Sequence, residues 1–330
     1  MIAFTLYRMY YLKDKKGGTM NKNKLLSFVA ILSAFLLILP VTAPAEESES
    51  LQLAQGQVNQ SHIKFGFRLA GGAALLMRND FNDHLQSYND LIDDISYISA
   101  DSEFEMIKMG TDFGGEILIS FLPHFSIGIG AGYLSAGKET AVELDIYGIY
   151  TEELSYHPKF SVIPITFSLY YGIPVGSFME VMLNAGFGYY LGTVDFDVYY
   201  KDTSGGMWSE ETETWSAKSN ALGFHGGIDL EFGIARNLAL VVGAKGRYAK
   251  LTDLTGDLDY EFDTSYGFSG SGTEEDLTLW YGNEDNGAGK EYPFVYLEEK
   301  KPTASWLHDV RKAEVNLSGI VFQAGIKVFF

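Results

Sequence analysis

Cysteine is absent from the 330 residues of this sequence. Its absence excludes a disulfide framework, a zinc–thiolate site, an iron–sulfur cluster and a thiol nucleophile. It also excludes a bacterial lipoprotein, whose lipid anchor is attached to an N-terminal cysteine. Basic residues are scarce too, with 24 Lys and Arg against 43 Asp and Glu. This imbalance argues against nucleic acid as a partner, because phosphate binding needs a basic surface.

Proline is also rare, with eight residues, whereas glycine (36), tyrosine (21) and phenylalanine (23) are abundant. Such a composition favours strands and turns over long helices or disorder. The mean hydropathy is zero. This value fits either a soluble protein or a membrane β-barrel whose strands average an apolar and a polar face. Composition alone does not distinguish the two classes.

The N-terminal region has the parts of a secretory signal peptide at residues 20–45. Lys22 and Lys24 form its basic start, residues 25–39 its apolar stretch and residues 43–45 (Ala-Pro-Ala) its cleavage site. A transmembrane anchor is the alternative, but the apolar stretch of 15 residues is shorter than the roughly 20 that a helical span needs. We therefore predict a cleaved signal peptide.

The segments around this signal are interpreted from its position. Residues 1–19 precede it and are interpreted as an upstream mis-start, with Met20 as the initiator. Residues 46–61 are polar and are interpreted as a flexible periplasmic lead-in. Cleavage after residue 45 removes six basic residues and one acidic residue, so the net charge of −19 becomes −24 in the mature chain.

Beyond residue 61 no apolar run is long enough for a helical span, and the recurring pattern is an alternation with period two. This alternation indicates strands with two different faces. In each segment, large apolar residues alternate with small or polar ones. It occurs at eight places: 63–69, 112–121, 127–133, 162–171, 180–189, 224–232, 240–248 and 320–330.

The connections between these segments are unequal in a regular way. Tight turns are expected at residues 122–124, 174–177 and 235–237, and the other connections are long. Short turns on one side and long loops on the other are typical of an outer-membrane barrel. We therefore predict that residues 62–330 form an all-β, eight-stranded, antiparallel, up-and-down transmembrane β-barrel with long extracellular loops and periplasmic termini. A soluble β-sandwich is the alternative.

The C-terminus carries a second indication of the same class. The last alternating segment ends in an aromatic residue, which is similar to the recognition signal that barrel-assembly machinery reads in outer-membrane proteins. The residues of this predicted signal are Phe322, Ile326, Val328 and Phe330.

Three segments resemble a known family. They are AGFGYYLG (185–192), GAKGRYAKLTDLTG (243–256) and the ending LSGIVFQAGIKVFF (317–330). They are similar to the small eight-stranded outer-membrane β-barrel domain family, which includes OmpA-, OmpX- and OmpW-like proteins. The resemblance implies the barrel architecture and a bacterial outer-membrane location, but it specifies function poorly. The sequence departs from the family in its very long last loop.

The polar side of the alternation would face the barrel interior, which eight strands leave just wide enough for side chains to fill. Five basic and five acidic residues fall on this side, and buried charges persist only when they are paired. We predict a structural ion-pair network in the barrel interior. Its members are Lys64, Arg68, Asp112, Glu116, Glu180, Asp229, Glu231, Lys245, Arg247 and Lys327.

Two smaller features of the interior have alternative interpretations. His225 is expected to be a hydrogen-bonded filler rather than a proton switch. Inward glycines, such as those at 128 and 186, could leave room for a channel or could accommodate bulky side chains from neighbouring strands. We favour the second interpretation.

The predicted loops hold the most distinctive composition. Apolar residues from Phe81 to Ile95 are spaced as in an amphipathic helix. Residues 253–312 form a long loop that combines acids with aromatics, and the alternation at 258–262 and 277–281 predicts that the last two strands extend into it as a β-ribbon. The four tryptophans all fall in the last two long loops. These loops are candidates for adhesion or ligand capture, or for a self-packed acidic cap.

No spacing supports catalytic residues, a metal site or a cofactor site, so we expect none and do not expect an enzyme. The predicted function is a monomeric closed scaffold that presents acidic, aromatic loops for surface interaction. Outer-membrane lipid, lipopolysaccharide and the barrel-assembly machinery are its expected partners, and the extracellular ligand is unidentified. The alternatives are a channel for small or hydrophobic solutes, as in the OmpW-like branch, and a lipid-modifying barrel enzyme.

Overall fold

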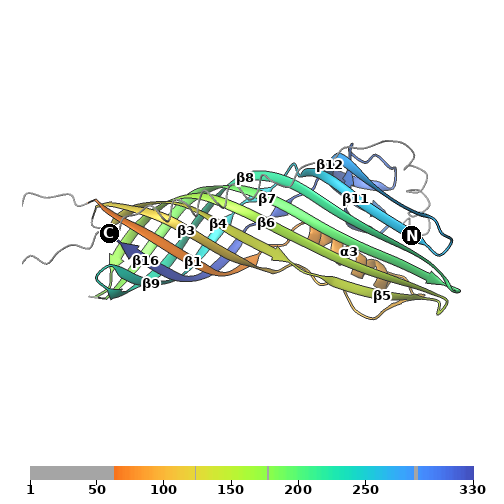
Figure 1. The fold of residues 1–330 in the computed structure, drawn as a ribbon, viewed down its shortest axis with the longest axis horizontal. Helices are drawn as coiled ribbons and strands as arrows, with labels where there is room; N and C mark the ends of the chain where they lie inside the picture. Colours follow the sequence, from red (N-terminus) through yellow and green to blue (C-terminus); the bar gives the residue numbers. More distant parts are fainter. Residues whose placement is uncertain (1–62, 123, 177, 286–288) are drawn as a thin grey trace, which may run out of the picture. The chain divides into compact units, whose positions relative to one another are not determined.

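The computed structural model describes residues 63–122, 124–176, 178–285 and 289–330. The segments interpreted above as mis-start, signal peptide and lead-in (1–19, 20–45 and 46–61) lie outside the described residues. The described chain is all-β and antiparallel, with one α-helix, which confirms the predicted class. Figure 1 shows that long strands run through most of it.

Eight of the strands contain the eight alternating segments predicted from the sequence. Within this set each strand pairs antiparallel with two others. The order β1-β3-β4-β6-β7-β8-β9-β16 returns to β1, so the pairing closes into a ring. Their bounds are β1 Lys64–Leu76, β3 Met109–Leu122, β4 Phe125–Gly137, β6 Tyr150–Pro174, β7 Met179–Ser204, β8 Met207–Ala235, β9 Leu238–Tyr248 and β16 Gly319–Phe329.

Further strands lie outside this ring, so the predicted count of eight is not confirmed. The main sheet has 14 strands, and a second sheet has two. The additional strands of the main sheet are β2 Ile98–Ala100, β5 Thr140–Ile146, β11 Thr255–Thr264, β12 Ser269–Asp285, β13 Glu291–Glu298 and β14 Leu307–Lys312. The two-stranded sheet joins β10 Lys250–Leu251 to β15 Val315–Asn316.

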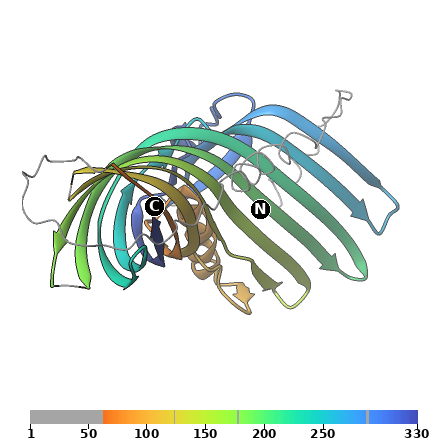
Figure 2. The same cartoon turned by 60° about the vertical axis from the view of Figure 1, so that its left-hand side comes forward.

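The additional strands widen the main sheet beyond the ring, and we call this part of it the distal sheet. It consists of β2, β5, β11 to β14, and residues 150–158, 195–204 and 207–218 of β6, β7 and β8. Within it β5 pairs with β6, and β8 pairs with β11, which pairs with β12. In Figure 2 these strands fan out as an arch.

Three predicted loops are therefore largely strands, and this corrects the sequence interpretation. The connection expected between the third and fourth segments contains the end of β4, the whole of β5 and the beginning of β6. The connection expected between the fifth and sixth segments is a continuation of β7 and β8, which meet at Gly205 and Gly206. Both glycines have positive φ values (56° and 85°), as a tight two-residue hairpin requires. The alternation continues through 190–222, and the polar side chains there were mistaken for loop composition.

The predicted loop at 253–312 likewise contains β11, β12, β13 and β14. Strands were predicted correctly at 258–262 and 277–281, but their pairing was wrong. They are not an extension of the last two ring strands, since β11 pairs with β8. Trp208 and Trp215 belong to β8 and Trp280 belongs to β12, so only Trp306 of the four lies in a connection.

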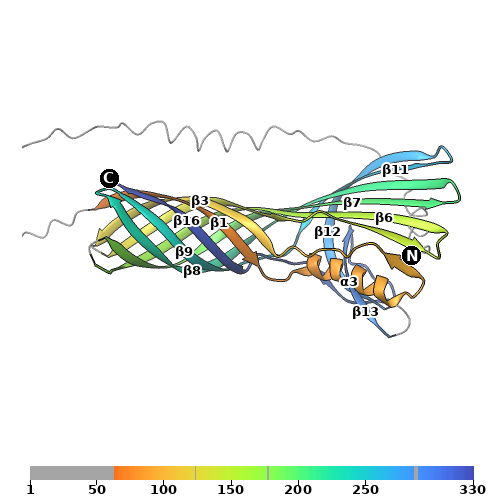
Figure 3. The same ribbon diagram turned by 90° about the horizontal axis from the view of Figure 1, so that it is seen from below.

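The helix predicted in the first long connection is confirmed as α3, Asp80–Asp94. Asn79 caps it, because its side chain accepts a hydrogen bond from the Asn82 amide at 3.1 Å. Phe81 packs edge-on against Phe160 of β6 and Phe196 of β7, with ring centroids 5.5 and 5.6 Å apart. Figures 2 and 3 show α3 on the concave side of the distal sheet.

The core lies mainly between this helix and the distal sheet, and it continues to the adjoining end of the ring. Large apolar side chains on the outside of the ring strands are instead exposed. No helix of the described chain combines the length and apolar character needed to span a membrane.

Candidate functional site

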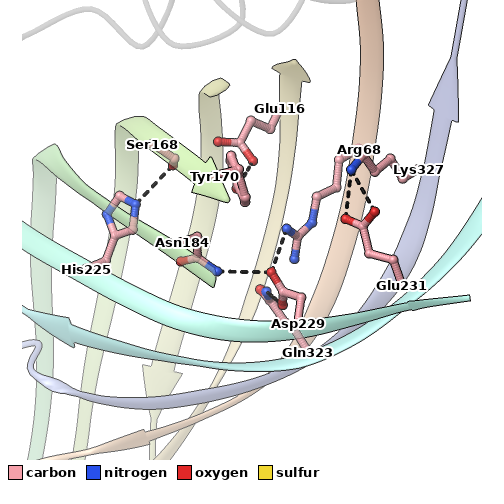
Figure 4. Close-up of polar contacts among 10 residues, drawn as sticks. All are labelled: Arg68, Glu116, Ser168, Tyr170, Asn184, His225, Asp229, Glu231, Gln323 and Lys327. Atoms are coloured by element: carbon pink, nitrogen blue, oxygen red, sulfur yellow. Dashed lines mark hydrogen bonds and ion pairs between the residues drawn. The ribbon is translucent and has the colours of Figure 1, made fainter. Parts of the chain in front are cut away.

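The interior of the ring collects most of the charged residues predicted from the sequence. Arg68 of β1 donates from Nη1 to Asp229 Oδ2 of β8 at 2.8 Å, and both side chains are at most 5% exposed. Asn184 Nδ2 and Gln323 Nε2 also donate to this carboxylate, at 3.1 and 2.9 Å. Three donors therefore satisfy one fully buried acid, as Figure 4 shows.

Two more ion pairs join strands across the ring. Lys327 Nζ lies 2.7 Å from Glu231 Oε2 and 2.9 Å from Oε1. Arg247 Nη1 donates to Asp112 Oδ2 at 2.8 Å, and its Nε donates to the Leu317 carbonyl at 2.9 Å. These two pairs and the Arg68–Asp229 pair join six of the ten predicted residues.

The other four predicted residues have different surroundings. Lys64 is exposed at the start of β1, and Glu180 lies 3.9 Å from the His124 imidazole rather than beside a lysine or arginine. Glu116 accepts a hydrogen bond from the Tyr170 hydroxyl. Lys245 is half-buried and has no ion-pair partner within 4 Å among the described residues. Charge balance alone did not specify which residues pair.

Uncharged polar residues also belong to this interior, and sequence reasoning missed them. They include Asn184 and Gln323, described above. They also include Tyr170, whose ring centroid lies 5.8 Å from the guanidinium carbon of Arg68, so that the cation lies over the aromatic ring. The signal was present, because all three occupy inward positions of the period-two alternation. The predicted network listed only lysine, arginine, aspartate and glutamate, so these three residues were left out.

The inward glycines make room for side chains of neighbouring strands. A Cβ atom at Gly128 would lie 2.2 Å from a Glu116 carboxylate oxygen. At Gly186 it would lie 2.0 Å from the Phe167 carbonyl oxygen and 2.7 Å from His225 Nε2. This supports the expectation that such glycines accommodate bulky residues rather than line a channel.

His225 of β8 is brought next to Ser168 of β6, with 3.0 Å between Nε2 and Oγ. A serine beside a histidine is the first element of a nucleophile–base pair. However, both side chains are buried inside the ring, and His225 Nδ1 has no hydrogen-bond partner among the described residues. The pair therefore lacks the third group that would orient the imidazole.

A small cavity of about 60 Å³ lies among these residues. Its lining includes Arg68, Asp112, Glu116, His225 and Lys245. Such a volume is large enough for a few water molecules, at about 10–15 Å³ for each. Glu116 Oε1 and His225 Nδ1, which have no partner in the described structure, are groups that ordered water would satisfy.

Beyond the polar interior, on the side of the distal sheet, lies an apolar cluster that we call the plug. It is formed by residues 249–254 and 313–317, which connect the ring to the distal sheet and pair through β10 and β15. Their apolar side chains Ala249, Leu251, Leu254, Ala313, Val315 and Leu317 are completely buried. A Cβ atom at Gly192 would lie 2.2 Å from a Leu251 methyl group, so the plug is packed tightly against β7.

The predicted C-terminal signal lies on β16. Phe322, Ile326 and Phe330 are exposed on the outside of the ring, and Val328 is half-buried. The Phe330 amide donates to the Phe65 carbonyl at 2.8 Å. The C-terminus is thus paired with the first strand of the ring.

No family model matches the chain, and no curated protein is similar enough to count as a relative. Within the described ranges, no three His, Cys, Asp or Glu side chains are grouped so as to hold a metal ion.

Proposed function

We propose that this protein is an outer-membrane β-barrel whose ring is a closed scaffold and whose distal sheet is presented outside the membrane for surface interaction. The observation that supports this most strongly is the inverted distribution of polarity in the ring. Charged side chains are paired inside it, and large apolar side chains are exposed outside it.

The exposed apolar side chains form a belt around the ring. Every ring strand contributes, including Phe65 of β1, Phe113 of β3, Ile129 of β4, Leu169 of β6, Phe187 of β7, Ile228 of β8, Val242 of β9 and Phe322 of β16. A soluble protein rarely exposes a contiguous apolar surface of this extent. Lipid around the belt would bury these side chains without a protein partner.

Closure of the ring satisfies the second condition for a strand structure in lipid. Unpaired backbone groups cannot face hydrocarbon, because each costs several kcal/mol. The β1–β16 pairing runs from Gly66–Phe329 to Leu76–Gly319 and leaves no free edge. A single chain closes the ring, which supports a monomer surrounded by outer-membrane lipid and lipopolysaccharide.

The plug and the ion pairs favour a closed scaffold over the solute-channel alternative. A channel would need a continuous passage, whereas the polar cavity is small and completely buried apolar residues lie above it. The distal sheet is then the part of the protein available for interaction.

The gel migration of the unheated protein, compared with that of the boiled protein, tests whether the ring is a membrane barrel. We expect the protein in outer-membrane fractions to migrate faster on gels unheated than boiled, because a closed barrel resists unfolding by detergent. Recovery in the soluble fraction without a heat-dependent shift would contradict the proposal.

Planar-bilayer recording of the purified protein tests whether the ring is closed to solutes. Steady channel openings in the wild-type protein would contradict the closed scaffold and favour the channel.

A further inference from the structure

One edge of the distal sheet has no partner strand. Residues 269–274 of β12 pair with β11 on one side, and β13 and β14 pair only with residues beyond 277. In the described structure nothing bonds to the backbone of 269–274 on its outer side. In Figure 2 the β11–β12 hairpin lies at the margin of the arch.

Two other edges of this sheet, along β5 and β13, carry protective features. Along β5, the Asp101 amide donates to the Glu143 carbonyl at 3.1 Å, and the Glu143 amide donates back to Asp101 Oδ1 at 2.9 Å. Ser102 Oγ donates to the Ala141 carbonyl at 3.0 Å. Strand β13 carries Pro293, which has no amide hydrogen to offer a new strand.

The open edge of β12 has none of these devices. Its sequence from 269 to 274 is Ser-Gly-Ser-Gly-Thr-Glu, without proline or lysine. Six residues at about 3.3 Å each give an edge of about 20 Å. Exposed backbone of this length is a template for strand addition by an extended peptide.

The acidic side chains around this edge indicate which kind of partner would bind there. Residues 255–278 contain no lysine or arginine, and their seven acids are Asp257, Asp259, Glu261, Asp263, Glu274, Glu275 and Asp276. A second copy of this chain would bring two such hairpins together, and their like charges would repel. An extended peptide with basic side chains complements them.

The concave face of the hairpin offers contacts for those side chains. A Cβ atom at Gly272 would lie 2.5 Å from the Tyr260 hydroxyl oxygen, and one at Gly270 would lie 2.8 Å from a Phe262 ring carbon. Both rings thus extend across the edge strand toward its open side. A lysine or arginine on the concave face of an added strand would lie against them, which is a favourable cation–π arrangement.

We propose that residues 269–274 of β12 bind an extended basic peptide segment by β-strand addition. Alternate Lys or Arg side chains of that segment lie against Tyr260 and Phe262. The inference deepens the proposed surface-interaction function and rests on it for the partner's access to this edge.

Synthetic peptides test the mode of binding on the full chain in detergent micelles. The probe is a fluorescein-labelled peptide of four Lys-Thr repeats, measured by fluorescence anisotropy. One derivative carries N-methyl groups on every lysine and another on every threonine, because these two sets of amides point to opposite edges of a strand. We expect one derivative to bind like the parent and the other to bind at least tenfold more weakly. Equal binding of both derivatives, or equal loss, would overturn strand addition.

Two controls address charge and location. A Glu-Thr repeat peptide should not bind, and binding of the Lys-Thr peptide should weaken with salt. Because the chain has no cysteine, Ser271→Cys introduces a unique thiol on the edge. It should form a disulfide with a cysteine-containing Lys-Thr peptide far faster than Thr212→Cys, which lies on β8 between two partner strands.

Equal trapping at both positions would overturn the assignment of the site. The gel shift on heating, measured on the same preparation, tests the barrel independently. A retained shift without peptide binding would contradict only this inference, whereas binding without a shift would contradict the barrel.

Discussion

Arg68 and Asp229 form an ion pair across the interior of the ring, between strands that are not neighbours. Two strands, β9 and β16, separate β8 from β1 in the pairing order. The two residues are 161 positions apart in the chain. The pair therefore links opposite parts of the ring and depends on the register of every strand between them.

Breaking this pair should destabilise the ring strongly. Arg68→Met leaves the buried Asp229 carboxylate without a cationic partner, and such changes typically cost about 3–5 kcal/mol. The free energy of unfolding in urea, measured in micelles, checks this. Lys64→Met is the matched control, because Lys64 lies on the same strand but is exposed, and its effect should be small.

A double variant separates pairing from packing. Arg68→Met with Asp229→Asn removes both charges and keeps an amide oxygen that can accept from Asn184 or Gln323, so most of the lost stability should return. A double variant as unstable as Arg68→Met alone would show that packing, rather than the unpaired charge, was responsible.

The glycines of the ring should differ sharply in their tolerance of alanine. Gly186→Ala places a methyl group against the Phe167 carbonyl and the His225 ring, and we expect it to cost about 1–3 kcal/mol. At Gly114 the nearest atom to an added Cβ is 3.4 Å away, so Gly114→Ala should be nearly neutral. Unfolding midpoints of the two variants check this, and equal midpoints would contradict the packing described above.

The apolar plug should contribute to stability as a buried core does. Leu251→Ala opens a cavity in tightly packed surroundings and should cost about 2–5 kcal/mol. Leu222→Ala is the control, because Leu222 is 76% exposed on the outside of β8. Similar losses in urea unfolding for the two variants would contradict a packed plug.

His84 should make the distal sheet sensitive to acid. Burial lowers the pKa of this histidine from 6.5 to about 3, and its Nδ1 accepts a hydrogen bond from the Val295 amide at 3.2 Å. The unfolded state therefore binds a proton more readily than the folded state, so stability is lost as pH falls from about 6.5 toward 3.

The variant His84→Asn tests the direction of this pH dependence. Asparagine keeps an acceptor near the Val295 amide but does not titrate, so the difference in unfolding free energy between pH 7 and pH 5 should shrink. An unaltered pH dependence in His84→Asn would contradict the buried neutral state.

Local pattern was sufficient to predict the strands of the ring and the helix. Alternation with period two depends only on which face of a strand is apolar, and it is visible within a few residues. The spacing of apolar residues from Phe81 onward predicted α3 for the same reason. Pairing between distant strands was less accessible, because β11 has no local feature that selects β8 over β9 as its neighbour.

The contacts inside the ring could likewise be predicted only in part from the sequence. Sequence indicated that charges of both signs face inward, and the structure brings Arg68 to Asp229 and Lys327 to Glu231. It does not pair Lys64, and it adds Asn184 and Gln323 to the Asp229 carboxylate. Which side chains meet depends on the register and tilt of eight strands, neither of which a single segment encodes.

The sequence by itself determined the all-β class, the alternating segments and the acidic character of the connections, because each is a property of neighbouring residues. Only the tertiary structure decided that β7 and β8 continue into a distal sheet, that the apolar side chains of residues 249–254 and 313–317 are completely buried, and that β12 is left with an open edge. These features arise from contacts between segments far apart in the chain, and such contacts form only when the whole sheet is assembled.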